Sequence, residues 1–312
     1  MRIGINVNQF AGGGRPATLD QILEQVASVE RQGFATAAFA NVSGYDALTM
    51  VTVAGRAVPR IELETAVVPV FTRHPVAMAQ QALTTHAATG GRLLLGIGLS
   101  HRPVVEERWG LSFERPVEYM QDYLAILLPL LRGQPVEFTG PRLRANTQLS
   151  VPEAPAPSVV LAALGERLLR LAGAHTDGTA LWMVGPETLA AHIAPIITDA
   201  ARQANRPPPR ILAGLPVCVT SDVAAARARA ARAFQMYGQL PSYRAMLDRE
   251  GVAGPEEVAV VGDESEVERR LAELEHAGAT DFTANPFGSA EEQQRTLELL
   301  RAMVAHGRSA PV

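Results

Sequence analysis

The stretch from Ile61 to Arg102 sets the strongest limit on how this chain can fold. It contains an apolar run over 61–70, an amphipathic segment over 75–89, a pair of glycines and a second apolar run over 92–99. This order predicts one strand–helix–strand unit whose two strands are buried. Because parallel strands present their ligand sites at their carboxyl ends, we expect a site among the polar residues that follow each strand.

The same alternation continues along the whole chain. Apolar runs predict strands at 2–7, 35–40, 61–70, 92–99, 158–163, 179–184, 211–219 and 280–284. Amphipathic segments predict helices at 19–33, 46–57, 75–89, 116–131, 165–174, 186–204, 222–237, 241–249, 264–276 and 290–304, and 136–146 predicts a short hairpin insertion. Eight strand–helix repeats in 312 residues favour a single (β/α)₈ barrel domain over 1–312. A doubly wound open sheet with six strands is the alternative.

Composition limits the classes of partner. A hydrophobic content of 47%, a charged content of 19% and a net charge of -4 indicate a globular chain and argue against nucleic acid as a partner. The single cysteine, Cys218, rules out a disulfide framework and is typical of a reducing cytosol. The sequence shows no signal peptide and no membrane span, so we expect a cytoplasmic protein with no membrane partner.

Short motifs exclude several chemistries. No HExxH motif, cysteine cluster or GxSxG elbow occurs, so we expect neither a metal site nor a serine nucleophile. The glycine run Gly12–Gly14 lacks the GxGxxG spacing and does not open a helix directly. It predicts a loop over the barrel mouth instead of a phosphate cradle.

Four motifs, in their order along the chain, resemble those of the luciferase-like monooxygenase superfamily. They are Gly33-Phe34 with Asn41, ETAVVPVFTRHP over 64–75, GRLLLGIG over 91–98 and NPFG over 285–288. Within that superfamily the chain resembles the branch that uses coenzyme F420, an 8-hydroxy-5-deazaflavin. The resemblance covers 2 to about 301 and implies a (β/α)₈ barrel with an insertion, a homodimer and a small-molecule substrate.

The resemblance also implies where the deazaflavin would bind. In that family a bulge in strand three, often with a non-proline cis peptide, supports the ring, and by spacing it falls near 65–67. The turn over 162–167 would bind the phosphate of the cofactor's tail, which agrees with the preference of helix N-termini for anions. The expected cofactor-binding residues are Asn41, Thr65, Ala66, Val67, Val68, Gly98, Ser100, His101, Arg102, Ala163, Leu164, Gly165, Glu166 and Arg167.

Two positions depart from the family pattern. Val42 stands where several relatives carry a proton-donating histidine, and Leu99 stands where some carry a glutamate. His101 is therefore the candidate acid/base residue, because histidine titrates near neutral pH. A surface role for His101 and a strand-end cap for Asn41 are equally good interpretations.

The substrate side of the mouth is expected to be apolar. Its candidate walls are Phe39, Phe71, Trp109 and Trp182. The resemblance and these walls together predict hydride transfer between coenzyme F420 and a hydrophobic organic substrate. One alternative is an FMN-dependent monooxygenase on the same barrel. A second is a deazaflavin-binding protein without catalytic activity, which the departures at Val42 and Leu99 would suit.

Overall fold

Parallel strands form a closed barrel in this protein. The computed structural model describes residues 1–11, 15–152 and 155–307, so the run Gly12–Gly14 lies outside the described residues. Within these ranges the barrel strands are β1 (Arg2–Asn6), β4 (Thr36–Phe39), β5 (Glu62–Thr65) with its continuation β6 (Val68–Pro69), β7 (Leu93–Gly98), β10 (Ser158–Ala162), β11 (Gly178–Trp182), β12 (Arg210–Val219) and β14 (Asp281–Pro286). Pairing of β10 with β7 closes the ring, so the barrel prediction is confirmed and the open sheet is excluded.

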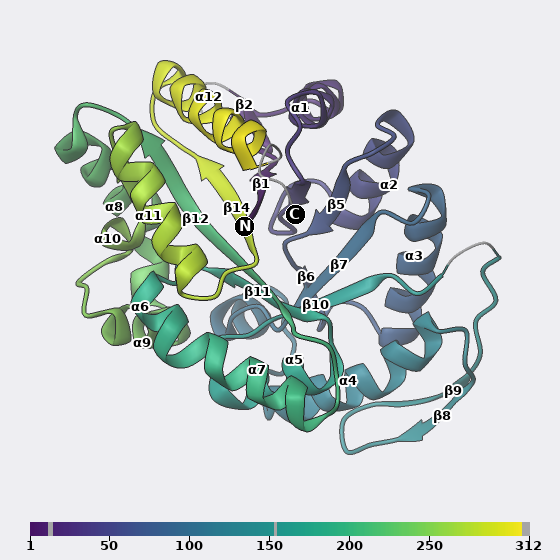
Figure 1. Ribbon diagram of the computed structural model, residues 1–312. Coiled ribbons are helices and arrows are strands. Elements are labelled where there is room, and N and C mark those ends of the chain that lie inside the picture. Colours follow the sequence, from purple (N-terminus) through teal and green to yellow (C-terminus); the bar gives the residue numbers. More distant parts are fainter. Residues whose placement is uncertain (12–14, 153–154, 308–312) are drawn as a thin grey trace.

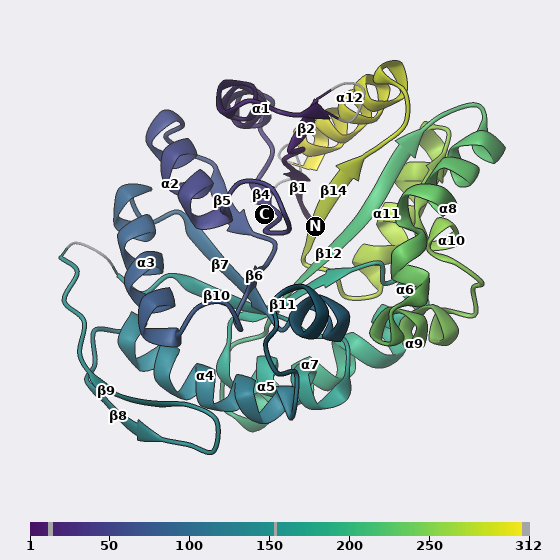
Figure 2. The same cartoon turned by 180° about the vertical axis from the view of Figure 1, so that it is seen from behind.

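Helices surround the strands on all sides (Figures 1 and 2). They are α1 (Leu19–Arg31), α2 (Ala47–Ala57), α3 (Pro75–Ala88), α4 (Pro116–Leu131), α5 (Glu166–His175), α6 (Pro186–Thr188), α7 (Ala194–Gln203), α8 (Val223–Gln239), α9 (Pro241–Glu250), α10 (Pro255–Val258), α11 (Glu264–His276) and α12 (Ala290–Gly307). The Thr18 side chain caps α1, and Asp222 caps α8 by accepting from the Ala225 N–H. No helix of the described ranges combines the length and the apolar character needed to cross a membrane.

Besides the short helix α10 and the short strands described below, the structure differs from the expected elements at strand three, at the helix after strand six and in the loop after β7. The run 61–70 forms two strands, β5 and β6, because an irregularity separates them. The helix expected over 186–204 is divided by a π-helical turn, η3 (Leu189–Ile193), because Pro195 cannot donate a backbone hydrogen bond. The loop after β7 contains a further π-helical turn, η2 (Val104–Arg108).

Short strands lie outside the barrel. β8 (Val136–Thr139) and β9 (Arg144–Thr147) form the expected hairpin, which lies next to α4 (Figure 1). β2 (Phe10–Ala11) pairs with β3 (Arg15–Pro16), and β13 (Val260–Gly262) adds to the edge of β12. These last strands are too short to give a period in the sequence.

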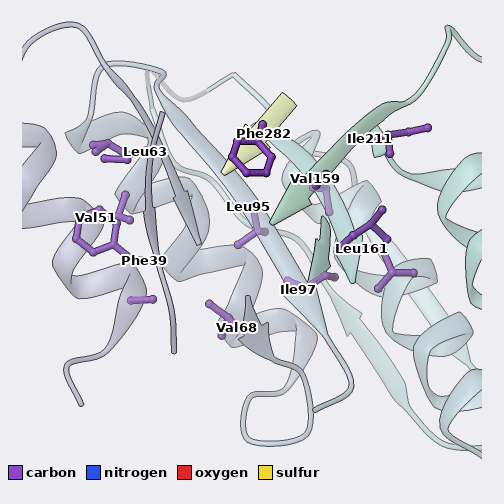
Figure 3. Close-up of a cluster of buried hydrophobic side chains, with 14 of the residues drawn as sticks. Phe39, Val51, Leu63, Val68, Leu95, Ile97, Val159, Leu161, Ile211 and Phe282 are labelled. Atoms are coloured by element: carbon purple, nitrogen blue, oxygen red, sulfur yellow. The ribbon is translucent and has the colours of Figure 1, made fainter. Parts of the chain in front are cut away.

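The barrel strands send alternate side chains outward and inward. On β7, Leu95 and Ile97 belong to the large core between the strands and the helices. Leu94 packs instead with Val160 and Leu212 from other strands, in a small cluster inside the barrel. Figure 3 shows part of this outer core, in which Phe39 of β4 lies beside Val51 of α2. Residues that pair in register with Leu94 on the neighbouring strands therefore also point into the barrel.

A charge network closes the amino-terminal end of the barrel. Arg210 donates to both carboxylate oxygens of Glu62, at 2.9 and 3.1 Å, and to both of Asp281, at 2.7 and 3.3 Å. Arg2 donates to Glu62 at 3.2 Å, and the Thr36 hydroxyl donates to the same carboxylate at 3.1 Å. In this floor network, as we call the four residues, the charges of Arg2 and Arg210 balance those of Glu62 and Asp281.

Replacing the central arginine tests the floor network. Arg210→Met is expected to lower the free energy of unfolding by about 2–4 kcal/mol, because it leaves two partly buried carboxylates with Arg2 as their remaining cation. Chemical denaturation measures the change. The control is Arg202→Met, whose ion pair with Asp199 is on the surface and whose loss is expected to cost about 0.5 kcal/mol or less. Equal losses in the two variants would contradict the assignment.

Candidate functional site

The irregularity between β5 and β6 is a bulge of one residue. Glu64 pairs with Leu94, and Val68 pairs with Ile97, so four steps on one strand span three steps on β7. The peptide bond between Ala66 and Val67 is cis. The predicted bulge, with a non-proline cis peptide at 65–67, is therefore confirmed. Ala66 and Val67 are half-buried, whereas the residues on either side of them are buried.

The Thr65 side chain stabilises the bulge. Its hydroxyl donates to the Gly96 carbonyl at 2.8 Å and accepts from the Gly96 N–H at 2.9 Å. One side chain thus replaces the ladder bonds that the irregular backbone cannot make. A Cβ on Gly96 would lie 1.9 Å from the Thr65 carbonyl oxygen, so only glycine fits at this position.

Two strand ends near the mouth have left-handed backbone. Ser100 follows β7 with φ of 60°, and Met183 follows β11 with φ of 55°. Non-glycine residues seldom adopt this conformation, and it is concentrated at functional sites. Gly98 lies under the bulge, where an added Cβ would be 2.8 Å from Val67 Cγ2. Of the expected residues that end this strand, Gly98 therefore lies directly beside the bulge.

A row of aromatic side chains extends from His101 across one side of the mouth. The His101 ring lies 5.5 Å from that of Tyr243, which lies 5.0 Å from that of Tyr237, and Trp182 follows at 6.0 Å. Burial lowers the pKa of His101, so its imidazole is neutral at neutral pH. The aromatic residues of α8 and α9 were not among the predicted walls. Tyr237 and Tyr243 are aromatics on helices, a pattern that more often indicates core packing.

A second aromatic group lies on the β6 side. Phe71 stacks on Tyr119 at 4.5 Å and lies 5.4 Å from Phe113, over which the Arg102 guanidinium sits at 5.3 Å. A hollow of about 420 Å³ is lined by Phe71, Leu111, Ser112, Tyr119, Pro141 and Arg142. A second hollow, of about 430 Å³ between α2 and α3, touches none of the predicted site residues. Phe71 thus remains a candidate wall.

Two helix N-termini near the mouth differ in what they can bind. The N-cap of α5 is Gly165, which has no capping side chain and has open space around its Cα. His192 contacts the Leu164 carbonyl at 2.9 Å and so fixes the turn before this helix. The N-terminus of α6 is already filled, because Glu250 accepts from the backbone N–H of Thr188 at 2.8 Å. Of these two termini, α5 is the one that can receive an anion.

Several expected site residues have other roles. Phe39 is fully buried among residues such as Val51 of α2 (Figure 3), so the prediction that it walls the mouth is wrong. Asn41 accepts from the Ala47 N–H at 2.9 Å, which supports the strand-end cap. Val42 is 76% exposed.

Two further expected site residues form ion pairs with neighbours on the same segment, and a third, Trp109, lies apart from the aromatic groups. Arg102 forms an ion pair with Glu106, and Glu166 forms one with Arg170 along the same helix. Trp109 ends the turn η2 and is half-buried, and it has no ring contact with either aromatic group among the described residues. The described residues contain no group of three or more histidine, cysteine or acidic side chains arranged to hold a metal ion.

The barrel interior contains buried polar atoms without partners. Glu64 Oε2 and Asn6 Oδ1 form no hydrogen bond within the described residues. Trp182 Nε1 is also buried, and Tyr237 is near it without meeting hydrogen-bond geometry. All three belong to inward-facing positions, on β5, β1 and β11. Buried polar groups are nearly always satisfied, so Asn6 and Glu64 need partners that the described residues do not supply.

The fold defines a parallel (β/α)₈ barrel protein, and its candidate ligand site lies at the carboxyl ends of the strands. The model of the family described as luciferase-like monooxygenase matches residues 1–281. The chain therefore belongs to the luciferase-like monooxygenase family. Its relatives include a putative coenzyme F420-dependent oxidoreductase of Mycobacterium tuberculosis, 34% identical over 145 residues that cover 46% of this chain and 41% of the relative.

Solved structures with the same fold come from proteins of both cofactor types. The coenzyme F420-dependent tetrahydromethanopterin reductase of Methanopyrus kandleri superimposes with a TM-score of 0.80 at 19% identity, covering 98% of this chain and 99% of that one. The oxygenating constituent of 3,6-diketocamphane monooxygenase of Pseudomonas putida, in complex with FMN, gives a TM-score of 0.77 at 16% identity, covering 98% of both chains. At these identities the likeness concerns the fold.

Removing one hydroxyl tests how the bulge is held. Thr65→Val keeps the shape of the side chain but leaves the Gly96 N–H and carbonyl without this partner in a buried position. We expect the free energy of unfolding to fall by about 2–4 kcal/mol. Thr84→Val, on the exposed face of α3, is the matched control and is expected to change it by about 0.5 kcal/mol or less. Urea denaturation distinguishes them, and a small effect at Thr65 would contradict this account.

Proposed function

We propose that this chain is a coenzyme F420-dependent oxidoreductase that transfers a hydride between the deazaflavin and a hydrophobic organic substrate. The observation that carries the proposal is the half-buried bulge at Ala66–Val67, which faces the mouth beside the strained end of β7. The Mycobacterium tuberculosis relative, named as a putative coenzyme F420-dependent oxidoreductase, supports it. The FMN-bound structure of the same fold makes FMN the competing cofactor.

The residues present suit a flat heterocycle with an anionic tail. The bulge and Gly98 keep side chains short where a planar ring would lie. The buried oxygens of Asn6 and Glu64, which lack partners within the described residues, would be available to polar ring atoms. Gly165 leaves the N-terminus of α5 open for a phosphate.

Each part of the mouth then has a task. Bound coenzyme F420 would supply a two-electron hydride carrier that reacts poorly with oxygen. Ala66 and Val67 would support the ring from below and fix its orientation. The aromatic row from Tyr243 to Trp182 would exclude water from the reacting atoms.

His101 is the residue that we assign to proton movement. Neither Val42 nor Leu99 can carry a proton, and His101 lies between the strained end of β7 and Tyr243. Its pKa is lowered by burial, so at neutral pH the ring accepts a proton through one nitrogen and donates through the other. A substrate hydroxyl could give up its proton to this ring as the hydride leaves its carbon.

Cofactor titration is the direct test of this function. We expect purified cofactor-free protein to bind coenzyme F420 at least about tenfold more tightly than FMN, a difference of about 1.4 kcal/mol. Fluorescence or calorimetry measures both affinities. Tight binding of FMN with no response to coenzyme F420 would overturn the proposal. Binding of coenzyme F420 with no turnover across a broad panel of alcohols and ketones would favour a non-catalytic binding protein.

A charge placed at the N-terminus of α5 tests the anion site. Gly165→Asp puts a carboxylate where the phosphate is expected, so we predict that affinity for the cofactor falls about tenfold or more. Aspartate is also a good N-cap, so the free energy of unfolding is expected to stay constant or to rise. Gly165→Ala is the matched control, because its Cβ would enter open space. Equal affinities of the two variants would exclude this turn as the phosphate site.

A further inference from the structure

Glu64 is the acidic residue inside the barrel that the floor network leaves out. It pairs in register with Ala38 on β4 and with Leu94 on β7, and Leu94 faces the barrel interior. Glu64 is 2% exposed, and its fully buried Oε2 forms no hydrogen bond within the described residues. It lies two residues before Ala66, between the floor and the bulge.

The surrounding charges favour a neutral carboxyl at this position. Glu62 on the same strand, Arg210 on β12, Asp281 on β14 and Arg2 on β1 are the charged groups that act on Glu64. They already balance one another, two cations against two anions, so an ionised Glu64 would add an uncompensated buried charge. Burial raises the pKa of Glu64 to about 8, and repulsion by Glu62 contributes to the rise.

A neutral carboxyl has one O–H group that needs an acceptor. The neighbouring inward side chains, at Ala38 and Leu94, provide none. Asn6 is in the same layer, because it pairs with Ala38, and its Oδ1 also has no partner. The protonated Glu64 carboxyl and Asn6 Oδ1 are therefore a donor and an acceptor in the same interior layer, with only the small Ala38 between them.

We propose that Glu64 is an internal acid that donates a hydrogen bond to the polar edge of the ligand bound over the bulge. This inference rests on the proposed function, because it takes the deazaflavin or a related flavin as that ligand. Asn6 Oδ1 accepts from an N–H group of the same ligand edge. A ligand with adjacent acceptor and donor atoms, such as a pyrimidine-like ring edge, satisfies both residues.

The cofactor-free protein gives the first test. Infrared difference spectra of wild type against Glu64→Gln at pH 7 are expected to show the carbonyl band of a protonated carboxylic acid. Because the folded pKa lies above the unfolded value of 4.5, the folded state keeps a proton that the unfolded chain has released. Wild-type Tm should therefore fall relative to that of Glu64→Gln by roughly 2 °C per pH unit between about pH 4.5 and 8. Glu268→Gln, on the exposed face of α11, should track the wild type.

Ligand binding gives the second test, with coenzyme F420 and FMN as the probes. Glu64→Gln keeps an uncharged donor and is expected to bind within about threefold of wild type, whereas Glu64→Leu should lose about tenfold. Wild-type affinity should also decline above about pH 8, and that of Glu64→Gln should not.

The outcomes separate this inference from the function on which it rests. A carboxylate band at pH 7 with a constant Tm difference would overturn the internal acid. Unchanged affinity of Glu64→Leu for a cofactor that wild type binds would overturn the hydrogen bond while leaving the proposed function intact. If wild type binds neither probe, the proposed function and the ligand contact both fail, and the spectra still decide whether Glu64 holds a proton.

Discussion

The paired hydrogen bonds between the Thr65 hydroxyl and the Gly96 backbone are the interaction on which the barrel mouth depends. They allow the chain to insert one extra residue without leaving a buried backbone group unpaired. The insertion reverses the alternation of the strand: Leu63 faces the helices before it, and Val68 and Val70 face them after it. Ala66 keeps its backbone hydrogen bond to the Phe39 carbonyl of β4 at 2.8 Å, but Ala66 and Val67 drop out of the pairing with β7 and stay half-buried.

Much of the architecture could be predicted because each strand and helix carries its own signal. The helix Pro116–Leu131 begins with a proline and ends before a glycine, and the structure gives it the predicted bounds. The side of each strand on which a given side chain lies was harder to predict from the sequence. In a barrel covered by helices both faces of a strand are buried, so the run around Phe39 shows no alternation that would reveal its outward direction.

The candidate site was predictable where backbone geometry decided it, and not where distant segments meet. The bulge was expected from the resemblance to the family, and the spacing of one motif within a single strand located it near 65–67. The contact between His101 and Tyr243 joins the end of β7 to α9, which lies more than a hundred residues further along the chain. The local spacing of residues in the sequence does not predict such a contact. Glu64 was overlooked as an individual residue because it was part of a motif. The signal was present, since two acidic residues, Glu62 and Glu64, interrupt the predicted buried strand.

The one-sided position of the bulge also has a stereochemical consequence. Ala66 and Val67 come from a single strand and approach the mouth from one direction, so a planar ring resting on them has one covered face and one free face. Atoms can then be exchanged at the free face alone. The protein backbone would then distinguish the two enantiotopic faces of a prochiral carbon in such a ring. This facial selectivity would persist whatever side chains evolve around the substrate.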